Sequence, residues 1–144
     1  MVEILRTENL SKRFGGLYAC SNIYFSLSEG AIKCIIGPNG AGKTTFISLL
    51  SGHQQQSEGS IWYKDNEISR MSVFERARKG IARKFQTPAL FDELTVYENI
   101  ELAVIGAKHF HRKRYSRIMD VLEMIRLTDE ISTMANRLPH GKRQ

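Results

Sequence analysis

The feature that most constrains the fold is a glycine-rich stretch that follows an apolar run, residues 31–36, and precedes a helix-like segment, residues 46–50. This order predicts a strand, a tight turn and a helix, which is the context that a phosphate-binding loop requires. Glycine has no Cβ, so the backbone can wrap closely around a phosphate and turn its N–H groups inward. The predicted phosphate-binding residues are Gly37, Pro38, Asn39, Gly40, Ala41, Gly42, Lys43, Thr44 and Thr45.

Within this loop the side chains suggest separate roles. Lys43 is expected to place its ammonium on the β- and γ-phosphates, and the Thr44 hydroxyl is expected to bind Mg²⁺, which prefers oxygen ligands. Thr45 is expected to assist at a phosphate, and the positive end of the new helix points at the same place. The alternative is a glycine-rich turn that binds nothing. We favour the phosphate loop because every fixed position of the longer pattern is met in the right context.

Composition favours an ordinary globular chain. The 144 residues are 42% hydrophobic, which is typical of a folded domain with a real core. No run approaches the roughly eighteen apolar residues of a membrane span, and the start lacks a secretion signal. We therefore expect a cytosolic protein whose membrane role, if any, comes through a partner. Cys20 and Cys34 lack metal-ligand spacing and are expected to be small buried apolar residues.

The net charge of +6 is concentrated in two basic clusters. Such clusters indicate either a surface for nucleic acid or a membrane, or solvated helix faces with a basic bias. We favour solvated faces because no aromatic residues for base stacking are interleaved with the charges, and nucleic acid stays the alternative. The clusters are Arg70, Arg76, Arg78, Lys79, Arg83 and Lys84, and then Lys108, Arg112, Lys113, Arg114 and Arg117.

The remaining pattern predicts a mixed α/β first part and a helical second part. Residues 2–25 alternate as antiparallel strands broken at Gly15 and Gly16, and residues 31–36 suit a strand covered on both faces. Further predictions are a helix end at Gly52, a hairpin over 57–66, a capped helix from Ser72 with Glu75 to Gly80, and a strand over 81–85. In the second part the sequence predicts a capping box of Thr95 with Glu98 and helices over 96–107 and 112–126.

Together, these motifs resemble the ATP-binding subunit of an ATP-binding-cassette (ABC) transporter, over nearly the whole chain. The resemblance implies an α/β P-loop NTPase fold: a RecA-like core with an antiparallel β subdomain at residues 1–86, and a helical subdomain at 87–144, incomplete at its C-terminus. It also implies that Phe14 stacks on adenine, for which a buried core residue is the alternative. Gln86 matches the family's glutamine loop, which contacts Mg²⁺ and the attacking water, so Lys43 and Gln86 are the implied catalytic residues.

The stretch around Gln86, with residues 91–102, resembles the branch that serves branched-chain amino acid and urea importers, most of all the urea-type subunits. The family's signature motif matches residues 138–142 at Leu138 and Gly141 and differs at Pro139, His140 and Lys142. Proline offers neither hydroxyl nor N–H, so the contact to the ATP of a second subunit is expected to be weakened unless His140 or Lys142 supplies a replacement. His109 and His111 lack a third metal ligand and are interpreted as surface residues.

The resemblance implies a subunit that binds ATP and Mg²⁺ and couples hydrolysis to solute uptake. Its implied partners are a second ATPase subunit, transmembrane permease subunits and, indirectly, a solute-binding protein, with no direct nucleic acid, at the cytoplasmic face of the membrane. The family's second acidic strand and switch histidine do not occur before Gln144, so turnover by this chain alone is in question. Two alternatives stay open: a soluble ATPase acting on nucleic acid or ribosomes, and a nucleotide-binding remnant without turnover.

Overall fold

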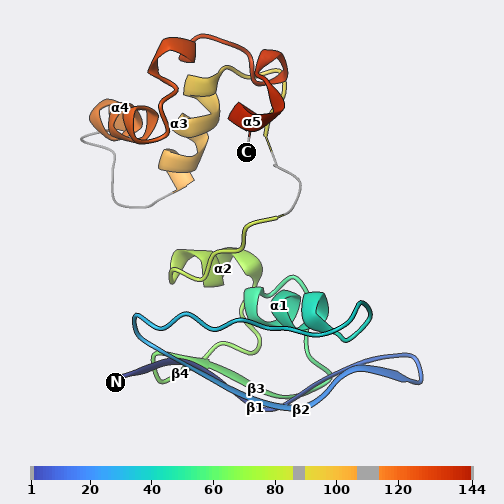
Figure 1. The fold of residues 1–144 in the computed structure, drawn as a ribbon. Helices are drawn as coiled ribbons and strands as arrows, with labels where there is room; N and C mark the ends of the chain where they lie inside the picture. Colours follow the sequence, from blue (N-terminus) through green and yellow to red (C-terminus); the bar gives the residue numbers. More distant parts are fainter. Residues whose placement is uncertain (1, 86–89, 107–113, 144) are drawn as a thin grey trace. The chain divides into compact units, whose positions relative to one another are not determined.

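The computed structural model describes residues 2–85, 90–106 and 114–143. The chain divides into two compact units, Met1–Arg83 and Lys84–Gln144, and each is described by itself (Figure 1). The first unit contains β1 (Glu3–Phe14), β2 (Leu17–Ser28), α1 (Lys43–Ser51), β3 (Glu58–Tyr63), β4 (Asn66–Glu67) and α2 (Val73–Arg78). The second contains α3 (Val96–Gly106), α4 (Arg114–Met124), the 3₁₀ helices η2 (Thr128–Glu130) and η3 (Ala135–Arg137), and α5 (His140–Arg143).

A four-stranded antiparallel sheet in the order β2-β1-β3-β4 forms the base of the first unit. The predicted break at Gly15 and Gly16 is confirmed, since it lies in the turn between β1 and β2, where Phe14 pairs with Leu17. The second predicted hairpin is also confirmed: β3 and β4 are joined through Lys64 and Asp65, both with positive φ.

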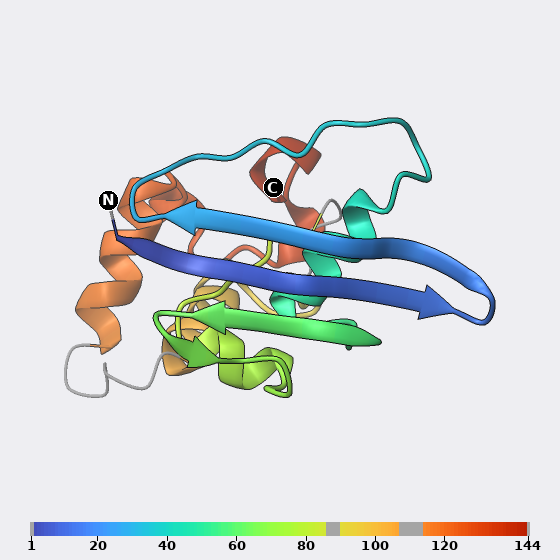
Figure 2. The ribbon, with the colours of Figure 1, turned by 90° about the horizontal axis from the view of Figure 1, so that it is seen from below.

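Helix α1 lies over one face of this sheet (Figures 1 and 2). The aromatic rings of Phe25 and Phe46 meet edge to face with centroids 5.4 Å apart, a favourable arrangement for aromatic pairs. The helix ends, as predicted, at Gly52, which adopts the left-handed conformation with φ 83° and donates its N–H to the Leu49 carbonyl. The buried core of this unit consists of Leu10, Cys20, Phe46, Leu49, Leu50, Ile61 and Ile68.

The predicted strand over residues 31–36 is wrong. These residues run back alongside β2 toward α1 without forming a strand (Figure 2), and Ile32 and Ile36 are 93% and 91% exposed. A strand requires backbone partners, and in the described part of the chain no strand is paired with this segment. Cys34, expected to be buried, is exposed for the same reason. The strand predicted over 81–85 is likewise absent.

Arg76, which was expected to lie on a solvated basic face, is buried instead. Its side chain is 1% exposed, and the guanidinium donates to the carbonyls of Leu49 at 2.6 Å, Leu50 at 3.0 Å, Ser69 at 3.0 Å and Met71 at 3.1 Å. Burial lowers the pKa of Arg76, yet a guanidinium keeps its charge in proteins. Arg76 therefore satisfies the carbonyls at the end of α1 that have no helical partner, while the predicted capping box of Ser72 with Glu75 starts its own helix.

Helices α3 and α4 form the core of the second unit. Ile118 and Leu122 of α4 are fully buried against Val96 of α3, with Leu127 and Leu138 completing the cluster. The predicted capping box is confirmed: the Thr95 N–H and hydroxyl both donate to the Glu98 carboxylate at 2.7 Å. These two bonds lower the pKa of Glu98. The Val96 and Tyr97 N–H groups donate to the carbonyls of Thr133 and Ile131. A loop far along the sequence therefore satisfies further N–H groups at the N-terminus of α3.

We predict that Arg76→Ala destabilises the first unit by about 3 kcal/mol, because buried carbonyls lose a charged donor. Arg78→Ala, at an exposed position where the guanidinium stacks on Phe74, should cost about 1 kcal/mol or less. Urea unfolding followed by the fluorescence of Trp62, the chain's one tryptophan, reports on this unit. Equal losses in the two variants would contradict the capping role.

Gly40 and Gly42 offer a matched pair of substitutions, since both have φ +82°. A Cβ at Gly42 would lie 2.1 Å from the Ala19 carbonyl oxygen, whereas at Gly40 no atom lies within 4 Å. Gly40→Ala should therefore cost only the left-handed strain, about 1–2 kcal/mol, and Gly42→Ala about 2 kcal/mol more. The same urea titration measures both, and equal midpoints would show that the hairpin does not constrain the loop.

Candidate phosphate-binding site

The N-terminus of α1 is open to an anion. Its cap, Gly42, makes no side-chain hydrogen bond, and the first turn carries no acidic residue. The Phe46 N–H donates to the Gly42 carbonyl at 2.8 Å, so the N–H groups of Lys43, Thr44 and Thr45 come before the first helical bond and have no helical acceptor. These donors and the positive end of the helix dipole suit a phosphate.

Lys43 points back into the loop that precedes it. Its ammonium donates to the carbonyls of Gly37 and Pro38, each at 2.6 Å. The loop is therefore curled around a positive charge, and Asn39, Gly40 and Ala41 form the exposed outer part of the curl. Thr44, one residue further, is exposed, so its hydroxyl is accessible to a metal ion at the same helix end.

The β1–β2 hairpin packs directly against the loop. Gly42 packs so closely on Ala19 that no other side chain would fit, and the Cys20 thiol lies 3.6 Å from the Gly42 carbonyl. Burial raises the pKa of Cys20, which keeps it a neutral thiol and a small packing residue. The third glycine of the motif is thus required by contact with the hairpin as well as by its backbone conformation.

Phe14 lies at the tip of the same hairpin and is 49% exposed, which excludes the alternative of a buried core residue. Its ring faces the Lys12 ammonium, 5.0 Å from the centroid, and its strand partner is Leu17. Leu17 lies two positions before Ala19, about 7 Å along an extended strand. The hairpin therefore places an exposed aromatic ring a short way from the phosphate loop, a separation that a nucleotide can bridge.

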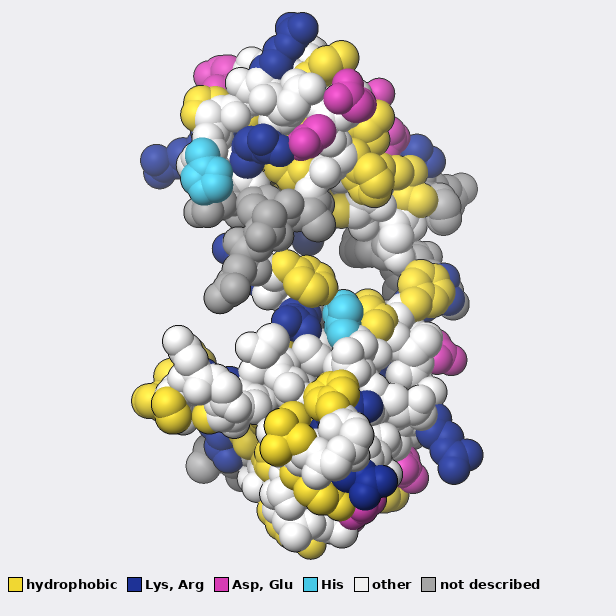
Figure 3. Space-filling view, turned by 90° about the vertical axis from the view of Figure 1, so that its right-hand side faces the viewer, with side chains coloured by type: hydrophobic (Ala, Val, Ile, Leu, Met, Phe, Trp, Pro, Cys, Tyr) yellow, Lys and Arg dark blue, Asp and Glu magenta, His cyan; other side chains and the backbone are white. Residues whose placement is uncertain are grey.

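A groove of about 820 Å³ runs beside the loop. One wall is β2, with Cys20, Ile23 and Phe25; the other is the irregular segment 31–36, and Gly42, Lys43 and Phe46 lie at its end. Hydrophobic side chains also reach the surface of both units on the face shown in Figure 3. The groove is mainly apolar, with Lys33 on one wall and Lys43 at the phosphate loop.

Sequence reasoning missed two residues of this site. The Ser48 hydroxyl donates to the Thr44 carbonyl at 2.7 Å, and Arg83 donates to that hydroxyl at 2.8 Å. The spacing of four residues places Ser48 beside Thr44 on a helix, so this contact was readable. Nothing in the local pattern pointed to Arg83.

Several predicted residues lie elsewhere. Gln86, His109 and His111 lie outside the described residues. The signature-like residues belong to the second unit: Leu138 is buried and Pro139 directly precedes α5. Residues 2–85, 90–106 and 114–143 contain no group of three His, Cys, Asp or Glu side chains that could hold a metal. A Mg²⁺ ion held by a hydroxyl and by phosphate oxygens needs no such group, so the loop fits the predicted cofactors.

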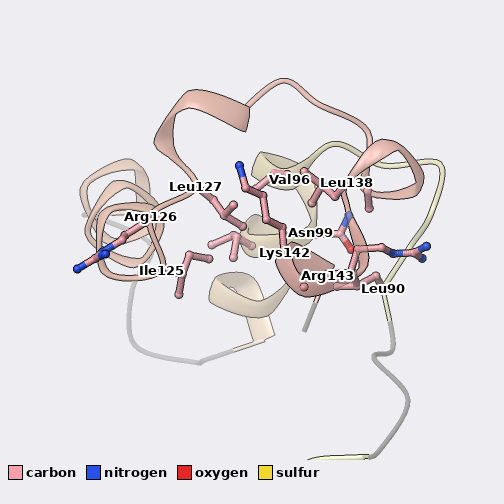
Figure 4. A pocket seen from close by; sticks show the side chains of 12 residues that line it. Leu90, Val96, Asn99, Ile125, Arg126, Leu127, Leu138, Lys142 and Arg143 are labelled. Carbon is pink, nitrogen blue, oxygen red and sulfur yellow. The ribbon is translucent and has the colours of Figure 1, made fainter.

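The second unit has a pocket of its own, of about 450 Å³ (Figure 4). Its apolar wall includes Ile125 and Leu127, and three of its polar side chains are already engaged. Asn99 accepts from the Phe91 N–H, Lys142 pairs with Glu130, and Arg143 pairs with Asp92. We assign no ligand to this pocket.

No helix within the described ranges has the length and apolar character needed to span a membrane.

A family model described as ABC transporter matches residues 20–144. The chain is 40% identical over 112 residues to a probable branched-chain amino acid transport ATP-binding protein, LivG, of Archaeoglobus fulgidus, covering 76% of this chain and 44% of that protein. It is 41% identical over 108 residues to the BraF protein of Pseudomonas aeruginosa, named for high-affinity transport of the same solutes, covering 75% and 41%.

Solved structures give the same answer for the fold. A nucleotide-free ATP-binding cassette of an ABC transporter superposes with a TM-score of 0.81 at 32% identity, covering 99% of this chain and 61% of that one. A cassette in its ADP conformation gives the same TM-score and identity. The chain spans less than half the length of the two curated relatives. The P-loop NTPase fold class predicted from the sequence is confirmed, and the chain belongs to the ABC transporter family.

Proposed function

We propose that this chain binds MgATP as the N-terminal part of an ABC importer's ATP-binding subunit. The observation that carries the proposal is the uncapped N-terminus of α1, with the Lys43 ammonium inside the preceding loop. Residues 37–45 hold the phosphates, Thr44 binds Mg²⁺, and Phe14 stacks on adenine. Gln86 supplies a further contact to Mg²⁺ and the attacking water, by its match to the family motif.

In the complete protein, we propose, two such subunits close over two ATP molecules and drive permease subunits in the membrane, which they meet at its cytoplasmic face. A solute-binding protein delivers the solute indirectly. Relatives named for branched-chain amino acid transport favour that solute class. The urea-type assignment depends only on the motif stretch around Gln86.

Removing the loop cation tests the proposal. Lys43→Ala should weaken ATP binding at least about 100-fold, because the phosphates lose a charge-assisted donor worth roughly 3 kcal/mol. Lys79→Ala, which removes the same charge at the exposed end of α2, is the matched control and should change the affinity less than about threefold. Isothermal titration with MgATP measures both, and an unchanged affinity in Lys43→Ala would refute the phosphate site.

The adenine contact can be tested separately from the phosphate contact. Phe14→Ala should lower ATP affinity by about 1–2 kcal/mol, the usual value of a base stacked on an aromatic ring. Binding of inorganic tripolyphosphate, which has no base, should not change. Tyr18→Ala, another exposed aromatic on the hairpin at 46% exposure, serves as the control. Equal losses for ATP and tripolyphosphate would contradict stacking by Phe14.

A further inference from the structure

Three residues of the first unit form a continuous hydrogen-bonded link. Arg83 Nη1 donates to Ser48 Oγ at 2.8 Å, and Ser48 Oγ donates to the Thr44 carbonyl at 2.7 Å. Ser48 is 8% exposed, so water competes little for its hydroxyl. The link begins at the last residue of the first unit and ends at the main chain of the predicted magnesium ligand.

The donor and acceptor capacities of the two side chains fix which group donates in each hydrogen bond. A guanidinium can only donate, and a hydroxyl has one proton to give. Because Arg83 occupies a lone pair of Ser48 Oγ, the hydroxyl proton is left for the Thr44 carbonyl. A charged donor polarises the hydroxyl and strengthens its own donation, since hydrogen bonds in a chain reinforce one another. The Thr44 peptide is therefore held more firmly than by the helical bond alone.

Ser51 shows what the same helix does without this arginine. Its hydroxyl donates to the Ile47 carbonyl at 2.8 Å, four residues back, and contacts His53 Nδ1 at 2.9 Å. The two serines thus make the same bond to the helix backbone, one turn apart. Arg83 donates a hydrogen bond to the Ser48 hydroxyl, whereas the Ser51 hydroxyl contacts His53, which makes Ser51 a matched reference.

The segment that carries Arg83 also binds the last turn of α1. Arg76 binds the carbonyls of Leu49 and Leu50 in the last turn, seven residues before Arg83 in the sequence. One segment therefore supplies both arginines that bind α1, one at Ser48 and one at the carbonyls of the last turn.

We propose that Arg83 is a positioning residue of the nucleotide site. Through Ser48 it fixes the Thr44 main chain, and with it the direction in which the Thr44 hydroxyl meets Mg²⁺. This inference rests on the proposed function. It couples the first turn of the phosphate-loop helix to the chain that leads out of the first unit.

Amide hydrogen exchange tests the link without any ligand. In Arg83→Gln and Ser48→Ala the amides of residues 46–48 should exchange about tenfold faster, since the first turn opens more readily. Ser51→Ala and Arg78→Gln should leave these amides unchanged. Unchanged exchange in Arg83→Gln would overturn the inference whatever the nucleotide does.

Nucleotide binding then tests the role. In Arg83→Gln the affinity for ADP with saturating Mg²⁺ should fall about five- to tenfold, as for a lost charge-assisted hydrogen bond. The affinity for ADP in EDTA should stay within about twofold, and Arg83→Lys should restore part of the loss. Equal falls with and without Mg²⁺ would show a merely structural role and overturn the inference.

The unaltered chain and Lys43→Ala serve as references in the same titration. An unaltered chain that binds no nucleotide overturns the proposed function. An unaltered chain that binds, loses affinity in Lys43→Ala and keeps its Mg²⁺-dependent affinity in Arg83→Gln overturns this inference alone.

Discussion

The contact between Gly42 and the Ala19 carbonyl is the constraint on which the phosphate loop depends. A side chain at this position would meet the carbonyl at 2.1 Å, so the loop can close on the hairpin only through a glycine. The hairpin's own register, with Phe14 opposite Leu17, then sets how far the exposed aromatic lies from the start of α1. The close contact between Gly42 and Ala19 thus fixes the positions of the loop, the helix and the hairpin tip.

The two ends of helix α1 differ in whether their backbone groups have hydrogen-bond partners. The negative end is satisfied by the buried guanidinium of Arg76, which binds the Leu49 and Leu50 carbonyls. The positive end has neither a capping side chain nor an acidic residue in its first turn. The backbone groups at both ends of a helix normally find hydrogen-bond partners. An anion therefore gains the most stabilisation at the positive end of α1, where the N–H groups have none from the helix. Lys43 adds its charge at the same end.

Local sequence signals predicted much of this fold correctly. The glycines between β1 and β2, the positive-φ cap at Gly52 and the two capping boxes each act within a few residues, and each is found where expected. The helices over 96–106 and 114–124 follow the same rule, because a capping signal and helical periodicity are visible along the chain itself. Gln86 stays a prediction, since it lies outside the described residues.

The sequence by itself determined the phosphate loop, the antiparallel hairpins and the helical second unit, since their chemistry is contained in short stretches. Only the tertiary structure decided which apolar run is buried: residues 31–36 have strand-like composition, yet Ile32 and Ile36 are exposed because no described strand pairs with them. It also decided that Arg76 and Arg83 point inward, to carbonyls and to Ser48, instead of into solvent. The contact of Arg83 with Ser48 joins residues 35 positions apart, so it depends on the folded chain and no local pattern encodes it.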